Sequence, residues 1–314
     1  MDPENDSLKI GKTELEIKSL GLGTWSWGDR MTWNFGGSHN EDDIRAAFET
    51  SLKAGIDFFD TAETYGRGKS EKYLGNFLKE SKESVVVATK FMPYPWRFTK
   101  NALLKSLKNS LKRLDLEQVD LYQVHWPLPP IPVETWADVL ADAVETGLTR
   151  AVGVSNYNED QMRRAYVVLA KRGIPLASNQ VEYHMLNRKV EFNGLLSACE
   201  KLGITLIAYS PLAQGVLTGK YTPDKPLPGM RRRKYSTSLL ESVRPLLRRM
   251  REIGREHDGK TPSQVALNWL ICKGTVPIPG AKNARQAQEN AAALGWRLTE
   301  GDVAELDEAS AEFS

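Results

Sequence analysis

Residues 56–66 read IDFFDTAETYG, an apolar run that ends at Asp60 and is followed five residues later by Tyr65. A carboxylate at the end of a buried strand costs free energy unless a cation pairs with it. The stretch VVVATKF, residues 85–91, places Lys90 at the same point of a second apolar run. We therefore expect the two runs to form neighbouring strands, with Asp60 paired to Lys90.

Apolar runs of this kind alternate along the whole chain with amphipathic helical patterns. Eight of them, rich in valine, leucine and aromatic residues, cover residues 20–25, 57–62, 85–91, 119–126, 150–156, 176–183, 205–211 and 275–281. Helical spacing of apolar residues covers 41–55, 70–81, 101–115, 135–147, 159–173, 193–203, 239–257 and 261–274. Strands that are apolar on both faces are typical of a buried parallel sheet. Strand–helix units repeated in this order predict an α/β fold, the (β/α)8 TIM barrel.

Two segments fall outside this repeat. We expect the stretch LKIGKTELEIK, residues 8–18, to form an N-terminal hairpin, and GDVAELDEASAEF, residues 301–313, to form an extra C-terminal helix. No linker or low-complexity tract divides the chain, which predicts a single domain over residues 1–314.

A doubly wound dinucleotide-binding fold is the alternative, and its glycine fingerprint is incomplete. Gly21 and Gly23 are followed by Ser26 where a third glycine is needed, and no acidic residue follows at the required distance. The GKS at residues 68–70 is not a phosphate loop, because Glu63 stands where the first glycine of that motif belongs. The sequence therefore favours the barrel.

Composition excludes several classes of function. The net charge of +2 in 314 residues favours neither nucleic acid nor an anionic membrane as a partner. We interpret the basic run RRRK, residues 231–234, as a solvated loop. No apolar run reaches the roughly 18 residues that a membrane span needs.

Cysteine and histidine usage bears on metal, redox chemistry and compartment. The two cysteines lie far apart and the four histidines are scattered, so we expect neither a disulfide framework nor a metal site. The stretch MDPENDSLKIG is acidic and polar, without the pattern of a targeting signal. We expect a soluble cytoplasmic protein, or one of the chloroplast stroma if this is the processed form of a plant protein.

Unusual polar residues occupy the ends of three consecutive predicted strands, where the catalytic groups of a barrel lie. Asp60, Lys90 and His125 end these strands, and Tyr65 lies in the loop after the first of them. We expect the charge of Lys90 to lower the pKa of Tyr65 from about 10, so that the phenol acts as a general acid. His125 would orient the substrate oxygen.

Each of these four residues also has a purely structural explanation. Asp60 can cap a loop, Tyr65 can pack at the rim, Lys90 can extend its stem to the barrel mouth, and His125 can be a buried structural residue. Their occurrence at successive strand ends favours catalysis. Nearby aromatic residues would wall an apolar substrate pocket suited to flat or hydrophobic aldehydes; they are Trp25, Trp96 and Trp126.

Seven motifs resemble, in order and spacing, those of the aldo-keto reductases, over roughly residues 8–308. They are DTAETYG, VVVATKF, VDLYQVHWP, RAVGVSNY, LASNQVEYH, IAYSPLAQGVLTGKY and PIPGAKNARQAQEN. The stretches FMPYPWR and GWRLT are similar to a plant and cyanobacterial branch that includes pyridoxal reductases. The resemblance implies a monomeric, metal-independent barrel that binds an extended nicotinamide dinucleotide. It also implies that Tyr65 is the general acid, supported by Lys90 and Asp60, with His125 as the orienting group.

The resemblance further implies where the cofactor lies. The nicotinamide carboxamide would contact Ser155, Asn156 and Gln180, with Tyr209 stacked on the ring. The pyrophosphate would lie near Ser210, Leu212 and Lys220, with Arg231 as a clamp. The adenosine end would contact Gly280, Lys282, Gln286, Glu289 and Asn290.

One departure from the family pattern bears on the choice of cofactor. Many members carry Lys-Ser and then Arg around the ribose 2′-phosphate, where this chain has Gly280-Ala281 and Gln286. Lys282 and Arg285 still supply positive charge there, so NADPH is preferred and NADH is the alternative.

The expected function is NADPH-dependent reduction of aldehydes or ketones to alcohols, by hydride transfer with Tyr65 as proton donor. One alternative is a cofactor-binding regulatory subunit of the ion-channel type, with slow or no turnover. The other is a metal-dependent barrel hydrolase or isomerase, which requires clustered His and Asp ligands at the strand ends.

Overall fold

The computed structural model describes residues 6–229 and 231–313. The first five residues of the polar N-terminal stretch, on which the expected lack of a targeting signal partly rests, lie outside this range. Eight parallel strands form one sheet in which chain neighbours are also sheet neighbours. They are β3 (Leu22–Gly23), β4 (Phe58–Asp60), β5 (Val86–Phe91), β6 (Val119–Val124), β7 (Thr149–Ser155), β8 (Leu176–Glu182), β9 (Thr205–Tyr209) and β10 (Val276–Ile278).

The sheet closes on itself between its first and last strands. Gly23 forms a parallel bridge with Gly280. The amides of Gly21 and Gly23 donate to the carbonyls of Pro277 and Pro279, each at 3.0 Å. These contacts confirm the predicted barrel.

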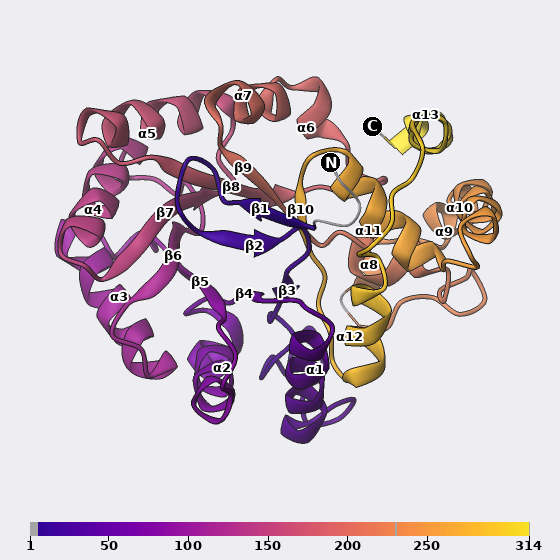
Figure 1. The fold of residues 1–314 in the computed structure, drawn as a ribbon, viewed down its shortest axis with the longest axis horizontal. Helices are drawn as coiled ribbons and strands as arrows, with labels where there is room; N and C mark the ends of the chain where they lie inside the picture. The colour runs from indigo at the N-terminus through magenta and orange to yellow at the C-terminus, as the bar shows by residue number, and fades with distance from the viewer. Residues whose placement is uncertain (1–5, 230, 314) are drawn as a thin grey trace.

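Helices surround the sheet (Figure 1). Those around the barrel are α1 (Glu41–Lys53), α2 (Lys69–Glu80), α3 (Lys100–Leu114), α4 (Val133–Glu145), α5 (Glu159–Lys171), α6 (Lys189–Phe192), α7 (Leu195–Leu202), α11 (Pro262–Cys272) and α12 (Ala284–Ala291). Further elements are α8 (Arg231–Lys234), α9 (Thr237–Ser242), α10 (Arg244–Glu256), α13 (Glu300–Ala309) and the short 3-10 helices η1 (Tyr65–Gly68), η2 (Ala213–Thr218) and η3 (Ala311–Phe313). None of the helices described is long and apolar enough to cross a bilayer.

Two expectations for the long segment between β9 and β10 need correction. The helix expected over 239–257 is two helices, α9 and α10, which meet at Val243. Pro245 lies in the first turn of α10, where its missing N–H is tolerated, whereas it would break a continuous helix. The basic run expected to be a loop forms the short helix α8.

The predicted hairpin closes one end of the barrel. Strands β1 (Ser7–Lys9) and β2 (Glu16–Lys18) pair antiparallel and lie across the barrel in Figure 1. Ile17 at the middle of β2 is fully buried. It belongs to a cluster with inward-facing residues such as Phe58, Leu121 and Ile207. With this end closed, the carboxyl ends of the strands are left for a site.

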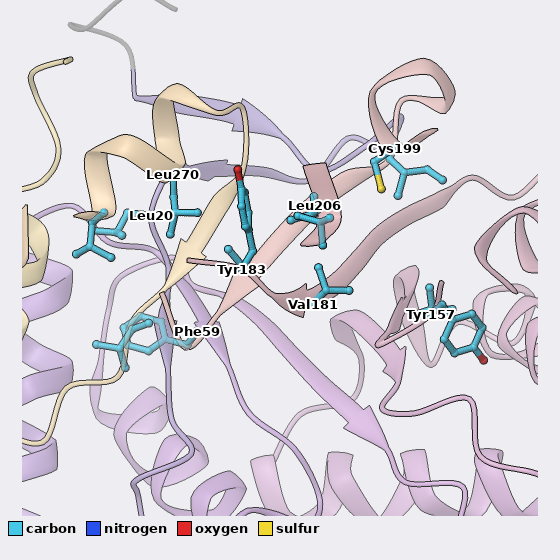
Figure 2. Packing of buried hydrophobic residues seen from close by; sticks show 14 of the residues in the cluster. Leu20, Phe59, Tyr157, Val181, Tyr183, Cys199, Leu206 and Leu270 are labelled. Atoms are coloured by element: carbon cyan, nitrogen blue, oxygen red, sulfur yellow. The ribbon is translucent and has the colours of Figure 1, made fainter. Parts of the chain in front are cut away.

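A second and larger apolar cluster fills the layer between the sheet and its helices. It includes Phe59 of β4, Val181 of β8 and Leu206 of β9, packed toward helical residues such as Leu270 (Figure 2). Strand residues therefore alternate between this outer layer and the interior of the barrel. This alternation turns Lys90 and Gln123 into the barrel.

Replacing Ile17 with alanine tests the closing role of the hairpin. We expect Ile17→Ala to lower the free energy of unfolding by about 2–5 kcal/mol, because it removes a buried side chain that fills the barrel interior. Glu16→Ala, at an exposed position of the same strand, is the control and should change the value by about 0.5 kcal/mol or less. Urea denaturation measures both. An Ile17→Ala loss of unfolding free energy no larger than that of Glu16→Ala would show that the Ile17 side chain does not contribute to the core.

Candidate active site

Asp60 and Lys90 form a buried ion pair at the top of the barrel interior. Lys90 Nζ lies 2.5 Å from Asp60 Oδ1, and both side chains are 2% exposed or less. The ammonium also donates to the carbonyl of Thr61 at 2.8 Å. Strands β4 and β5 are neighbours, so the pairing predicted from the sequence is confirmed.

Tyr65 lies beside this pair, but its pKa does not follow our expectation. Lys90 Nζ is 3.5 Å from Tyr65 Oη. Burial, and secondly the charge of Asp60, raise the pKa of Tyr65 well above its ordinary value of 10.0. The prediction that the pKa of Tyr65 is lowered is therefore wrong, because burial of the phenol and the nearby carboxylate of Asp60 both raise it. The phenol is protonated at neutral pH, as a proton donor must be.

The imidazole of His125 faces Tyr65. The two rings meet edge to face at 5.8 Å. Burial, with the nearby charge of Lys90, lowers the pKa of His125 to about 3, so the ring is neutral at physiological pH. Its Nδ1 is buried and has no hydrogen-bond partner among the described residues.

Two amide side chains complete the surroundings of Asp60. Gln180 Nε2 donates to Asp60 Oδ2 at 2.8 Å, and Gln123 Nε2 reaches the same oxygen at 3.3 Å. Ser178 in turn donates to Gln123 Oε1 at 3.4 Å. Gln123 and Ser178 were not expected at the site. The signal for Gln123 is its position in VDLYQVHW, where a polar residue points inward two residues before His125.

The residues expected at the nicotinamide form a second connected group. Ser155 donates to the carbonyl of Gln180 at 2.8 Å, and Asn156 Nδ2 donates to the carbonyl of His125 at 3.0 Å. Tyr209 Oη donates to Asn156 Oδ1 at 2.9 Å. Asn156 has a φ of 61°, a left-handed conformation that asparagine tolerates better than most residues. The ends of β7, β8 and β9 are thus joined.

One cavity of about 940 Å³ gathers nearly all the residues predicted for the site. Its lining includes Asp60, Tyr65, His125, Trp25, Trp126, Ser155, Asn156, Gln180, Tyr209, Ser210, Leu212, Lys220, Arg231, Gly280, Lys282, Gln286, Glu289 and Asn290. Two of the predicted residues, Lys90 and Trp96, do not line the cavity. The ammonium of Lys90 lies 5.0 Å from the centre of the Tyr65 ring. Trp96 is 69% exposed and stacks on Tyr94 at 4.6 Å, so its placement in the substrate pocket was wrong.

Positive charge collects in the part of the cavity formed by the loops after β9 and β10. Lys282 and Arg231 lie on the ring of Trp33, at 5.0 and 4.7 Å from its centre, and Lys220 lines the same region. Lys282 Nζ donates to the carbonyl of Trp33 at 2.9 Å and Arg231 Nη1 to the carbonyl of Gln214 at 3.3 Å, and none of the three cations forms an ion pair with a described carboxylate. Burial, followed by the charges of Arg231 and Lys220, lowers the pKa of Lys282 to about 8. The basic run is thus only partly solvated, since Arg231 belongs to this cavity.

Trp33 is a lining residue that the sequence analysis missed. It lies in the loop between β3 and α1 and contacts Trp25 edge to face at 5.4 Å. Its Nε1 and the Nε of Arg231 are buried donors without a partner among the described residues. Nothing in the sequence around Trp33 indicates that this loop reaches Arg231 and Lys282, which are 198 and 249 positions away.

The described residues hold no group of three or more His, Cys, Asp or Glu side chains arranged to bind a metal ion.

Removing the charge of Asp60 tests the ion pair. Asp60→Asn leaves Lys90 buried without its counter-ion, and we expect a loss of about 3–5 kcal/mol in unfolding free energy at pH 7. The folded-state pKa of Lys90, already lowered by burial, would fall further below that of the unfolded chain. The unfolded state then binds more protons, so the loss should shrink as pH rises from 7 toward 10. Urea denaturation of both proteins at pH 7 and pH 10 measures this loss of unfolding free energy. A loss that is the same at both pH values would contradict the pairing.

Comparison with known proteins agrees with this geometry. A sequence model of the Aldo/keto reductase family matches residues 19–311. The chloroplastic pyridoxal reductase of Arabidopsis thaliana is 42% identical over 317 residues, covering 97% of this chain and 86% of that one. A glycerol dehydrogenase structure from Gluconobacter oxydans has a TM-score of 0.86 at 27% identity, covering 100% of this chain and 97% of that one.

A fourth match bears on the cavity. The structure of an aldo-keto reductase from Klebsiella pneumoniae in complex with NADPH has a TM-score of 0.76 at 26% identity, covering 96% of this chain and 94% of that one. The match of the family model and the identity to the plant reductase extend over nearly the whole chain. The chain therefore belongs to the aldo/keto reductase family.

Proposed function

We propose that the protein reduces small aldehydes or ketones to alcohols with NADPH, and that Tyr65 is the proton donor. The observation that carries this proposal is the meeting of Tyr65, Lys90, Asp60 and His125 at one end of a cavity whose other end is cationic. A phenol and an imidazole suit a carbonyl oxygen, and a cationic region suits phosphates.

The donor set of the cavity fits a phosphorylated nicotinamide dinucleotide. Lys220, Arg231 and Lys282 offer positive charge that forms no ion pair with a described carboxylate. The buried donors Trp33 Nε1 and Arg231 Nε lack acceptors among the described residues. Ser155, Asn156 and Gln180 present hydroxyl and amide groups at the opposite end, where they would hold a carboxamide. When bound, the dinucleotide supplies the hydride.

The protein's own residues supply the proton and the field around the carbonyl oxygen. Tyr65, protonated because its pKa is raised, donates its proton to that oxygen. Lys90 Nζ, 3.5 Å from Tyr65 Oη, stabilises the negative charge that forms on the phenol as the proton leaves. His125 is neutral and can donate an N–H to the same oxygen, a contribution of about 3–4 kcal/mol for a well-placed donor.

The substrate end of the cavity is aromatic, which favours a flat or apolar body. Trp25 lies 6.3 Å from the ring of Tyr65, and Trp126, 40% exposed, lines the opening. The plant relative's name, pyridoxal reductase, supports including pyridoxal among the aldehydes tested.

Replacing Tyr65 with phenylalanine tests the proton donor. We expect Tyr65→Phe to reduce the rate of NADPH oxidation with an aldehyde by at least about 100-fold, within the range lost with a general acid. NADPH affinity, measured by fluorescence titration, should stay nearly the same, because the ring remains. Trp96→Ala, outside the cavity, is the control and should keep the rate. Equal loss of cofactor binding and turnover in Tyr65→Phe would contradict a chemical role.

Lys282 offers a test of cofactor choice and of pH. A 2′-phosphate is a dianion above about pH 6, and burial lowers the pKa of Lys282 to about 8. The preference for NADPH over NADH should therefore fall as pH rises through 8 in the wild-type protein. Lys282→Ala should weaken NADPH binding about tenfold or more while leaving NADH within about twofold, and should remove this pH dependence. A similar loss for both cofactors would rule out a contact with the 2′-phosphate.

A further inference from the structure

Glu63, two residues before Tyr65, is a buried carboxylate that the proposed chemistry does not use. Its side chain is 8% exposed, and both of its oxygens accept hydrogen bonds. Oε1 accepts from the amide of Met92 at 2.7 Å and from the guanidinium of Arg97. Oε2 accepts from the hydroxyl of Ser106. One carboxylate thus joins the Tyr65 loop, the loop after β5 and helix α3.

Arg97 extends this connection through the loop after β5. Its Nη1 also donates to the carbonyl of Met92 at 3.0 Å. Its guanidinium lies on the rings of Phe91 and Tyr94, at 5.4 and 5.3 Å from their centres. The loop 92–97 is therefore folded around a cation whose carboxylate partner is Glu63.

The backbone of Glu63 continues the pairing between β4 and β5 beyond the end of β4. Thr61 N donates to Ala88 O at 2.8 Å, and Glu63 N donates to Lys90 O at 3.4 Å. The side chain of Glu63 then takes the next amide along, that of Met92. Glu63 therefore holds the Lys90 segment at two points: its amide bonds the carbonyl of Lys90, and its side chain bonds the amide of Met92 two residues later. Glu63 thus fixes the height of Lys90 relative to Tyr65, and with it the 3.5 Å between Nζ and Oη.

We propose that Glu63 is a positioning residue for carbonyl reduction, holding the Tyr65 loop and the loop 92–97 as one unit through Arg97. The inference rests on the proposed function. A shift of about 1 Å between reacting groups can cost on the order of 100-fold in rate. An ion pair that only stabilised the fold would change unfolding and leave the chemical step unaltered.

The test compares Glu63→Gln with a matched control, Glu191→Gln. Glu191 is also a buried carboxylate, 10% exposed, and is paired with Arg188 at 2.8 Å, but it lies in α6 and does not line the cavity. The readouts are the single-turnover rate of NADPH oxidation at saturating aldehyde, NADPH affinity and thermal unfolding.

We expect Glu63→Gln to lower the single-turnover rate about 10- to 100-fold. Its NADPH affinity should stay within about twofold, because the residue does not line the cofactor region, and both variants should lose stability to a similar extent. The control should keep its rate within about twofold. A rate for Glu63→Gln equal to that of the control would overturn the proposal.

The role of Arg97 has its own test. If Glu63 acts through Arg97, the double variant Glu63→Gln/Arg97→Met should lose no more rate than Glu63→Gln alone, because coupled residues are not additive. If the rate losses of the two single variants multiply in the double variant, Glu63 does not act through Arg97 and this part of the proposal is overturned. Arg97→Met alone leaves a buried carboxylate without its cation, so the double variant carries the test if this single variant fails to fold.

Hydrogen–deuterium exchange provides a readout that does not require turnover. Glu63→Gln should increase exchange together in residues 61–66 and 92–97, and Glu191→Gln should leave both segments unchanged. If the wild-type protein reduces no carbonyl, the proposed function fails, and this measurement still decides whether Glu63 joins the two loops. Unchanged exchange in either segment would overturn the inference.

Discussion

The structure depends on one buried ion pair, Asp60–Lys90, placed where the closed interior of the barrel meets its open end. Two ions can be buried only if their remaining donors and acceptors are also satisfied. The protein achieves this with Gln180 and Gln123 on Asp60 and with the Thr61 carbonyl on Lys90. Four segments of chain thus meet around one carboxylate and one ammonium. The same constraint fixes Lys90 beside Tyr65, so the interaction that organises the core also places the residues on which the proposed chemistry rests.

Much of this could be predicted from the sequence, because the signals are local and repeated. The strand–helix alternation specifies the barrel, and two oppositely charged residues ending adjacent apolar runs specify their pairing. The hairpin residues Leu15 and Ile17 alternate with polar neighbours, as a strand with one buried face requires. What failed was the direction of the Tyr65 pKa shift. It depends on how deeply the phenol is buried and on its distance from Asp60, and no pattern of residue types contains these quantities.

Other features stayed hidden because they depend on contacts between distant parts of the chain. The pairing of β7 with β8 skips Ala177, an irregularity of the kind that redirects side chains near active sites, and here Ser178 and Gln180 both reach the Gln123–Asp60 network. Gly153 leaves room for them, since a Cβ there would lie 2.3 Å from Ser178 Oγ. Trp33 meets Arg231 and Lys282 through loops that follow three different strands. Trp96 was placed in the pocket because it is aromatic and lies near a strand end. The sequence does not show which way its side chain points, and in the structure it is exposed.

In the proposed function, cofactor and substrate would share one cavity with two electrostatic characters. At the barrel centre, charge is paired and buried, and the neutral groups Tyr65 and His125 line the cavity. Farther out, cations without carboxylate partners among the described residues face a region that suits phosphates. Binding energy gathered at the cationic end would hold the dinucleotide while the neutral end acts on the carbonyl.

The central claim is direct hydride transfer from the cofactor to a carbonyl carbon at this site. The most direct measurement is incubation of the purified protein with NADPH deuterated at the transferable position and a panel of aldehydes that includes pyridoxal. The alcohols formed are then analysed by mass spectrometry. The account predicts an alcohol that carries one cofactor-derived deuterium on its carbinol carbon. Alcohol without that deuterium, or tight cofactor binding with no alcohol from any aldehyde, would contradict it.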